Sequence, residues 1–218
     1  MPTPKESLSL IRSRINASLP QGAKPPLLVG VTKGQSQEEI LKFYMLGMRD
    51  FGENKIQEAL LKIEALPKDI SWHFIGHLQS NKVKDAVGKF VLIHSIDSLK
   101  LLEKINCRAR EIGIAQDVLL EVNVSNEKTK IGLKMSEVKG VLENSKGMEN
   151  IRVLGLMTLA PYGAKETETI FKTLRDLAHS FGLSELSMGM SDDFETAIKE
   201  GATIIRIGRA LYGEHPIA

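Results

Sequence analysis

The sequence predicts a closed parallel (β/α)₈ barrel, the TIM-barrel fold, preceded by an extra N-terminal helix. Eight short β-rich runs alternate with amphipathic helical stretches along the chain, as repeated strand–helix units require. Several of the runs are continuously apolar, which is typical of parallel strands that are covered on both faces. A doubly wound open sheet is the rival architecture, because periodicity does not distinguish an open sheet from a closed one.

The predicted elements follow one another in a regular order. The stretch SLSLIRSRINASL (7–19) is the extra helix before the first strand. Apolar residues at helical spacing also predict helices at SQEEILKFYMLG (36–47) and ETETIFKTLRDLAHSFG (166–182). The eight predicted strands cover residues 27–33, 50–54, 71–77, 91–97, 117–125, 152–160, 185–191 and 203–211.

Length and composition limit the classes of protein that fit. At 218 residues the barrel is small against the typical size of about 250, and no Pro/Gly-rich linker divides the chain, so we expect a single domain over 1–218. The formal net charge is +2 without a basic stripe, which argues against a nucleic-acid binder. No apolar run reaches the about 20 residues that span a bilayer, and the amino terminus lacks a signal-peptide core. With one cysteine, Cys107, we expect a cytoplasmic protein.

A lysine closes the first predicted strand, in LLVGVTKG. Function in such a barrel lies at the carboxyl ends of the strands, and Lys33 lies at one of them. Strand alternation places Lys33 on the same face as Val29 and Val31; if that face is the barrel interior, burial disfavours its charge. A desolvated lysine can attack a carbonyl as a neutral amine and form a Schiff base. The alternative is a lysine that reaches the rim or pairs with Glu53.

The residues that follow the seventh and eighth predicted strands suit the binding of a phosphate group. Ser191 lies where a strand gives way to a helix, in SMGMSDDFETAI, although Ser191 or Asp192 would also serve as an ordinary helix cap. Gly208, in RIGRALYG, allows close approach of a ligand to the backbone. Barrels frequently bind phosphate after strands seven and eight, and closure brings these strands beside strand one. A lysine next to a phosphate cradle indicates pyridoxal 5′-phosphate (PLP).

Three histidines fall near the ends of neighbouring strands. His73, His77 and His94 lack Cys, Asp or Glu partners at metal-like spacing, so we expect no metal site. His73, between Trp72 and Phe74, is interpreted as a hydrogen-bonded core residue.

Seven stretches also resemble a known family, the YggS/PROSC group of PLP-binding homeostasis proteins, which have the fold of the alanine racemase N-terminal barrel. They span residues 29–213 in order, and read VGVTKG, FGENKIQEA, WHFIGHLQSNK, VNVSNEKTKIGL, GLMTLAP, SMGMSDDFETAI and RIGRALYG. The resemblance implies that Lys33 is the Schiff-base lysine and that Arg206 faces the pyridine nitrogen. It also implies that Ser191 and the backbone of Gly208 and Arg209 bind the phosphate. Asn54 and Met157 would line the cofactor, and His77 would lie near the open side of the site.

Two positions depart from the family pattern. Thr32 stands where the family usually has a serine, so a hydroxyl is retained. Arg209 stands where a threonine is usual, which removes one hydroxyl and adds a cation. We expect phosphate binding to persist through the backbone.

The resemblance leaves two functional classes. Racemisation needs a base on each face of the α-carbon, and Lys33 supplies one. In racemases of this fold the second base comes from a C-terminal domain of a partner subunit, which we do not expect here because the chain stops at Ala218. An arginine against the pyridine nitrogen, Arg206, also makes the ring a poorer electron sink. We therefore expect a monomeric, non-catalytic PLP holder, with no catalytic residues and with apo-PLP enzymes as candidate recipients; a PLP-dependent racemase or lyase is the alternative.

Overall fold

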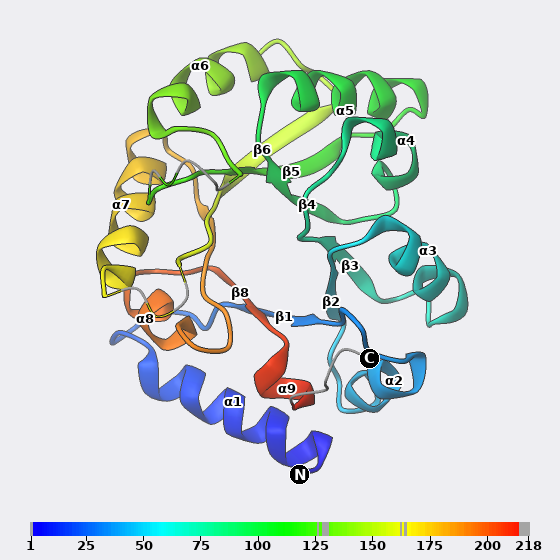
Figure 1. Ribbon diagram of the computed structural model, residues 1–218, viewed down its shortest axis with the longest axis vertical. Coiled ribbons are helices and arrows are strands. Elements are labelled where there is room, and N and C mark those ends of the chain that lie inside the picture. The colour runs from blue at the N-terminus through cyan, green and yellow to red at the C-terminus, as the bar shows by residue number, and fades with distance from the viewer. Residues whose placement is uncertain (1, 126, 128–130, 162, 164, 214–218) are drawn as a thin grey trace.

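Eight parallel strands close into a barrel in the computed structural model, in the order β1-β2-β3-β4-β5-β6-β7-β8 (Figure 1). The structure describes residues 2–125, 127, 131–161, 163 and 165–213. β1 pairs with β8 as well as with β2, which confirms the closed barrel and excludes the open sheet. The strands are β1 (Leu27–Val31), β2 (Asp50–Glu53), β3 (Ser71–Phe74), β4 (Leu92–Ile96), β5 (Gln116–Glu121), β6 (Ile151–Met157), β7 (Glu185–Ser187) and β8 (Ile204–Ile207).

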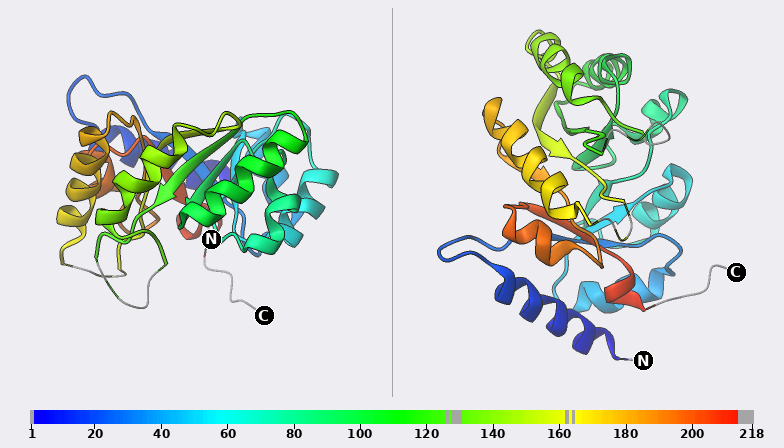
Figure 2. Two further views of the ribbon diagram at one scale, coloured as in Figure 1. Left: turned by 90° about the horizontal axis from the view of Figure 1, so that it is seen from above. Right: turned by 60° about the vertical axis from the view of Figure 1, so that its left-hand side comes forward.

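Helices form a ring outside the strands (Figures 1 and 2). The predicted extra helix is α1, whose start is fixed by a capping box between Thr3 and Glu6. α1 lies beside α8 and α9, where Arg14 stacks over Phe194 and forms an ion pair with Glu195 at 2.9 Å. The helical elements are α1 (Pro4–Ser18), α2 (Gln37–Met45), α3 (Ile56–Ala65), η1 (Ser80–Lys82), α4 (Val83–Ala86), α5 (Leu99–Glu111), α6 (Met135–Ser145), α7 (Thr167–Ser180), α8 (Phe194–Lys199) and α9 (Arg209–Tyr212). None of the described helices is long and apolar enough to cross a membrane.

Several strands end earlier than the sequence predicts. β7 stops at Ser187, and Gly189 follows with φ +93°, in the left-handed region that glycine adopts readily. A methyl group at Gly189 would lie 2.6 Å from the Cβ of Ala197, so the close approach of this loop to α8 also requires glycine. β8 stops at Ile207 and turns directly into α9. The segments after these strands are therefore loops at the carboxyl end of the barrel.

The core has two compartments. The larger one lies between the strands and the helices. A smaller apolar cluster fills the barrel interior with Val29, Leu92, Leu119, Met157 and Ile204. Alternate residues on the same strands bring polar side chains into that interior as well, and these determine the chemistry of the carboxyl end.

Candidate functional site

Lys33 lies in a turn at the carboxyl end of β1. β1 ends at Val31, and the Lys33 side chain is exposed. The expectation that its ammonium is held inside the barrel is therefore wrong. The alternation stops because the Thr32 carbonyl accepts a hydrogen bond from the Gln35 N–H at 3.0 Å and Gly34 adopts φ +71°, which turns the chain outward.

A buried ion pair beneath this turn fixes the residue before Lys33. The Thr32 hydroxyl donates to Glu53 Oε1 at 2.5 Å, and Lys62 Nζ, on α3, donates to the same oxygen at 2.5 Å. Lys62 also donates to the Thr32 carbonyl at 2.8 Å. Glu53 is thus paired with Lys62, so the alternative of a Lys33–Glu53 pair is wrong, whereas the alternative of a lysine at the rim agrees with the exposure of Lys33. The exposed amine is carried on a turn that is anchored from below.

Asn54 and His77 follow β2 and β3 at the same end of the barrel. Asn54 Oδ1 is buried and has no hydrogen-bond partner among the described residues. β2 and β3 approach so closely here that a methyl group at Gly76 would lie 2.2 Å from the Asn54 carbonyl oxygen. His77 is exposed, and its Nδ1 lies 3.2 Å from the Asp97 carboxylate. Asn54 therefore faces inward at the mouth, whereas His77 lies at its rim.

The loops after β7 and β8 meet each other. The Ala210 N–H donates to the Ser191 hydroxyl at 3.2 Å, and Arg209 forms an ion pair with Asp192. Ser191 and Asp192 are not the helix cap, because α8 begins later with Asp193 as its N-cap residue. The structure thus brings together Ser191, Gly208 and Arg209, the three predicted phosphate contacts.

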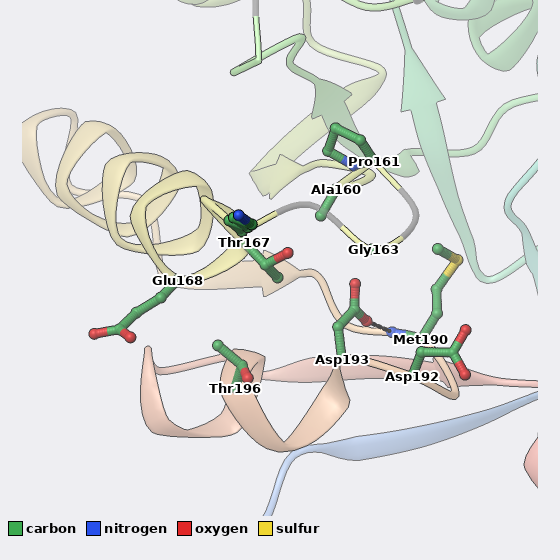
Figure 3. Close-up of a pocket in the computed structure, with 10 residues that line it drawn as sticks. Ala160, Pro161, Gly163, Thr167, Glu168, Met190, Asp192, Asp193 and Thr196 are labelled. Atoms are coloured by element: carbon green, nitrogen blue, oxygen red, sulfur yellow. Dashed lines mark hydrogen bonds between the residues drawn. The ribbon is translucent and has the colours of Figure 1, made fainter.

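A cavity of about 570 Å³ lies beside these loops, between the segments that follow β6 and β7 (Figure 3). Its described lining includes Glu168, Asp192 and Asp193, and Asp193 accepts a hydrogen bond from the Met190 N–H at 2.6 Å. Burial raises the pKa of Asp193 above its ordinary value, and Arg206 partly offsets this. The lining also holds Lys165, but its three carboxylates outnumber that one cation and make the cavity unfavourable for phosphate, and Lys33 is not part of it. We therefore place the candidate site at the barrel mouth and not in this cavity.

Arg206 lies inside the barrel, below the mouth. One guanidinium nitrogen donates to the Ser187 hydroxyl, and the other donates to the Thr158 carbonyl at 3.0 Å. Burial lowers the pKa of Arg206 to about 10, although the carboxylates of Glu121 and Asp193 act in the opposite direction. Arg206 is therefore a buried cation that is held by two hydrogen bonds inside the barrel.

Met157 is the other inward residue that the sequence indicates. It is buried in the interior apolar cluster. Its carbonyl accepts a hydrogen bond from the Val122 N–H at 2.8 Å, so it also joins β6 to the end of β5.

Glu121, at the end of β5, is an inward residue that sequence reasoning missed. Burial raises its pKa to about 7, with Arg206 lowering it and Asp97 raising it further. Strand alternation with Leu119, which lies inside the barrel, could have indicated Glu121. The predicted fifth strand runs on to residue 125, however, so the sequence does not place Glu121 at a strand end.

His73 is confirmed as a buried, hydrogen-bonded core residue: its Nδ1 lies 3.0 Å from His94 Nε2. Within the described part of the chain, no group of three or more His, Cys, Asp or Glu side chains could hold a metal ion.

Proteins with similar sequences carry one description, and a family model covers most of the chain. Residues 22–216 match the family model described as alanine racemase, N-terminal domain. The pyridoxal phosphate homeostasis protein of Aquifex aeolicus is 45% identical over 221 residues, covering 96% of this chain and 97% of that protein. The human protein of the same name is 34% identical over 210 residues, covering 87% of this chain and 76% of its own length.

Solved structures of related proteins have the same barrel fold. PipY of Synechococcus elongatus PCC7942, solved with PLP bound, superimposes with a TM-score of 0.85 at 34% identity, over 97% of this chain and 100% of that one. An alanine racemase of Clostridium difficile, solved with cycloserine, gives a TM-score of 0.76 at 17% identity over 97% of this chain and 60% of its own, which shows the shared fold alone. The matched domain, the curated relatives and the barrel agree: the chain belongs to the family of pyridoxal phosphate homeostasis proteins.

Proposed function

We propose that this protein binds PLP through a Schiff base on Lys33 and acts in PLP homeostasis as a holder of the cofactor with little or no turnover. Relatives of this name at 34–45% identity and the PLP-bound PipY support the proposal. A single folded domain over 1–218, a monomer in solution and delivery to apo-PLP enzymes belong to the same proposal.

One observation carries the assignment: the turn with Lys33 lies beside the loop with Gly208. β1 and β8 are hydrogen-bonded neighbours, and a methyl group at Gly208 would lie 3.3 Å from the Cβ of Val31. Ser191 is hydrogen-bonded to the same loop through the Ala210 N–H. An amine and a close-approach backbone segment therefore share one edge of the mouth, which suits a ligand with an aldehyde at one end and a phosphate at the other.

The residues present fit such a ligand. Gly208 leaves its backbone uncovered by a side chain, and Asn54 Oδ1 is a buried polar atom that lacks a partner among the described residues. In the proposal Lys33 is the covalent attachment; Ser191 and the backbone of Gly208 and Arg209 bind phosphate. Asn54 and Met157 line the ring, Arg206 faces the ring nitrogen, and His77 borders the open side.

The electrostatics favour a holder over an enzyme. Bound PLP supplies an aldehyde that condenses with an amine and a ring that can accept electrons. Arg206 is hydrogen-bonded on its inner side and remains cationic at neutral pH, so it disfavours a protonated ring nitrogen and weakens the ring as an electron sink. The shared racemase fold keeps a racemase or lyase as the second candidate.

The test of cofactor binding is attachment at Lys33. We expect the full chain to gain a visible absorbance band with PLP, and borohydride followed by peptide mapping to find the reduced cofactor on Lys33. Lys33→Arg keeps the positive charge but cannot condense, so it should lose the band. Lys55→Arg, an exposed lysine in an ion pair with Glu58, is the matched control. Label on another lysine, or an unchanged band in Lys33→Arg, would overturn the assignment.

The choice between holder and enzyme rests on turnover. PLP-loaded protein should racemise alanine and serine no faster than free PLP does. Racemisation well above that level, and lost in Lys33→Arg, would favour the enzyme.

A further inference from the structure

A chain of polar side chains crosses the barrel interior beneath Arg206. Asp50 Oδ1, at the start of β2, lies 3.2 Å from His73 Nε2. His73 Nδ1 lies 3.0 Å from His94 Nε2, and His94 Nδ1 lies 2.8 Å from the Ser187 hydroxyl. That hydroxyl accepts from Arg206. His73, His94, Ser187 and Arg206 are all buried, so these contacts form one continuous path through the protein.

The two ends of the path determine the direction of every hydrogen bond when the imidazoles are neutral. Arg206 can only donate, and the Asp50 carboxylate can only accept. Ser187 accepts from Arg206 and donates to His94 Nδ1; His94 Nε2–H then donates to His73 Nδ1, and His73 Nε2–H to Asp50. Both rings are therefore held as the Nε2–H tautomer.

Burial keeps the middle of the path uncharged. The pKa of His94 is lowered well below its ordinary value by desolvation, with His73 and Arg206 acting in the same direction. A neutral ring with one donor and one acceptor satisfies both neighbours without placing a second cation near Arg206.

The path begins at the opposite end of the barrel from the mouth. Asp50 lines a cavity of about 470 Å³ at the amino end, together with Arg12, Pro26 and Leu28. Its side chain is partly exposed, whereas Ser187 at the other end is fully buried. The guanidinium below the mouth is thus linked by hydrogen bonds to a carboxylate at the other end of the barrel.

We infer that Asp50, His73, His94 and Ser187 are positioning residues that act in series to orient the Arg206 guanidinium toward the barrel mouth, and so set how firmly the protein retains its cofactor. The last step rests on the proposed function. The hydrogen-bonded relay itself does not, because it is complete in the protein alone. Hydrogen bonds that end on charged groups are stronger than those between neutral groups. Removal of the Asp50 carboxylate should therefore loosen the orientation of the Arg206 guanidinium.

The first experiment needs no cofactor. Long-range nitrogen NMR of the full chain without PLP, assigned with His73→Asn and His94→Asn variants, should show both rings as neutral Nε2–H tautomers. Asp50→Ala should release both rings from this single tautomer, because the carboxylate that requires a donor from His73 Nε2 is gone. A cationic ring, or an Nδ1–H tautomer at either position in the wild-type protein, would overturn the relay.

The second experiment measures release of PLP into excess apoenzyme trap. We expect Asp50→Ala to release PLP about fivefold faster than wild type, the size expected for losing the equivalent of one ordinary hydrogen bond, because the lost contact is partly exposed and acts on Arg206 through the path. Asp50→Asn keeps an acceptor for His73 and should restore slow release. Asp117→Ala is the matched control, because Asp117 also lies near the start of a strand, is exposed to a similar extent and has one ion-pair partner, Arg152.

Action in series is tested by combining changes. In a Ser187→Ala background the relay is already interrupted, so adding Asp50→Ala should not accelerate release further. Independent, multiplying effects would refute action in series, as would Asp50→Ala behaving like Asp117→Ala. If Asp50→Ala does not fold, His73→Asn takes its place, because it interrupts the path without removing a direct contact to Arg206. If wild-type protein binds no PLP, the proposed function fails, while the NMR result still judges the relay.

Discussion

Glu121→Gln should change how the stability of the protein depends on pH. The wild-type carboxyl group is buried in the barrel mouth, and its pKa is raised from 4.5 to about 7, mainly by desolvation. In the unfolded chain the same group titrates near its ordinary value. Between these two values the native state therefore holds a proton that the unfolded state has lost.

The sign and size follow from linkage. Because the native state binds the extra proton, stability from this group is complete below pH 4.5 and is lost as the pH rises to about 7. At about 1.4 kcal/mol for each pKa unit, and with part of the loss already complete at pH 5, the loss from pH 5 to pH 8 is about 2.5 kcal/mol. Glutamine has no such proton, so the stability of Glu121→Gln relative to wild type should rise by about that amount over the same interval.

Urea unfolding without PLP measures this difference, with fluorescence of the one tryptophan, buried Trp72, as the probe. The free energies of unfolding of both proteins are compared at pH 5 and pH 8. Glu149→Gln, on the surface, controls for the loss of one carboxylate. If the difference between Glu121→Gln and wild type is the same at both pH values, Glu121 is not the buried, protonated group described here.

Three further substitutions test the packing around the site, each by urea unfolding. Lys62→Met leaves buried Glu53 charged and without its cation, and should cost about 3–5 kcal/mol; a loss under 1 kcal/mol would mean that water reaches Glu53. Gly189→Ala meets both a left-handed φ of +93° and a 2.6 Å contact, and should cost at least about 2 kcal/mol, whereas a neutral result would show that the loop relaxes. Arg14→Gln removes a partly exposed ion pair with Glu195 and should cost less than about 1 kcal/mol; a larger loss would indicate that its stacking on α8 contributes substantially.

The barrel itself was predictable because its signals are local and repeated. Eight apolar strand runs separated by helical periodicity leave few alternatives for a chain of 218 residues, and closure then makes β1 and β8 neighbours. The nearness of Lys33 to Gly208 and Ser191 followed from that topology. It required no knowledge of side-chain contacts.

The exposure of Lys33 could not be predicted, because the end of β1 depends on distant residues. Thr32 is buried because Glu53 and Lys62, 21 and 30 residues further along the chain, satisfy its hydroxyl and its carbonyl. Lys62 reads in the sequence as one more charged residue on the amphipathic α3. Only the fold shows that its amine reaches beneath the strand.

The helix cap after β7 depends on context in the same way. Ser191, Asp192 and Asp193 are all good cap residues by type, so composition does not choose among them. None of the three side chains caps α8: the Ser191 hydroxyl accepts a hydrogen bond from the Ala210 N–H, Asp192 pairs with Arg209, and Asp193, at the N-cap position, accepts from the Met190 N–H. Arg209, which departs from the family pattern, is therefore ion-paired with Asp192, and this carboxylate partly neutralises its positive charge in the absence of a phosphate.

The exposure of Lys33 bears directly on the choice between holder and enzyme. Catalysis on a PLP ring benefits from a closed site, because excluded water strengthens the electrostatic interactions and protects reactive species. Here the amine lies on an exposed turn while the polar machinery, Arg206 and Glu121, is buried below it. In the proposed function, an imine on Lys33 would remain open to water and to competing amines, which would permit release and transfer. The anchored turn under Lys33 and the held Arg206 would then provide retention, so the proposal assigns both binding and release of the cofactor to the same mouth.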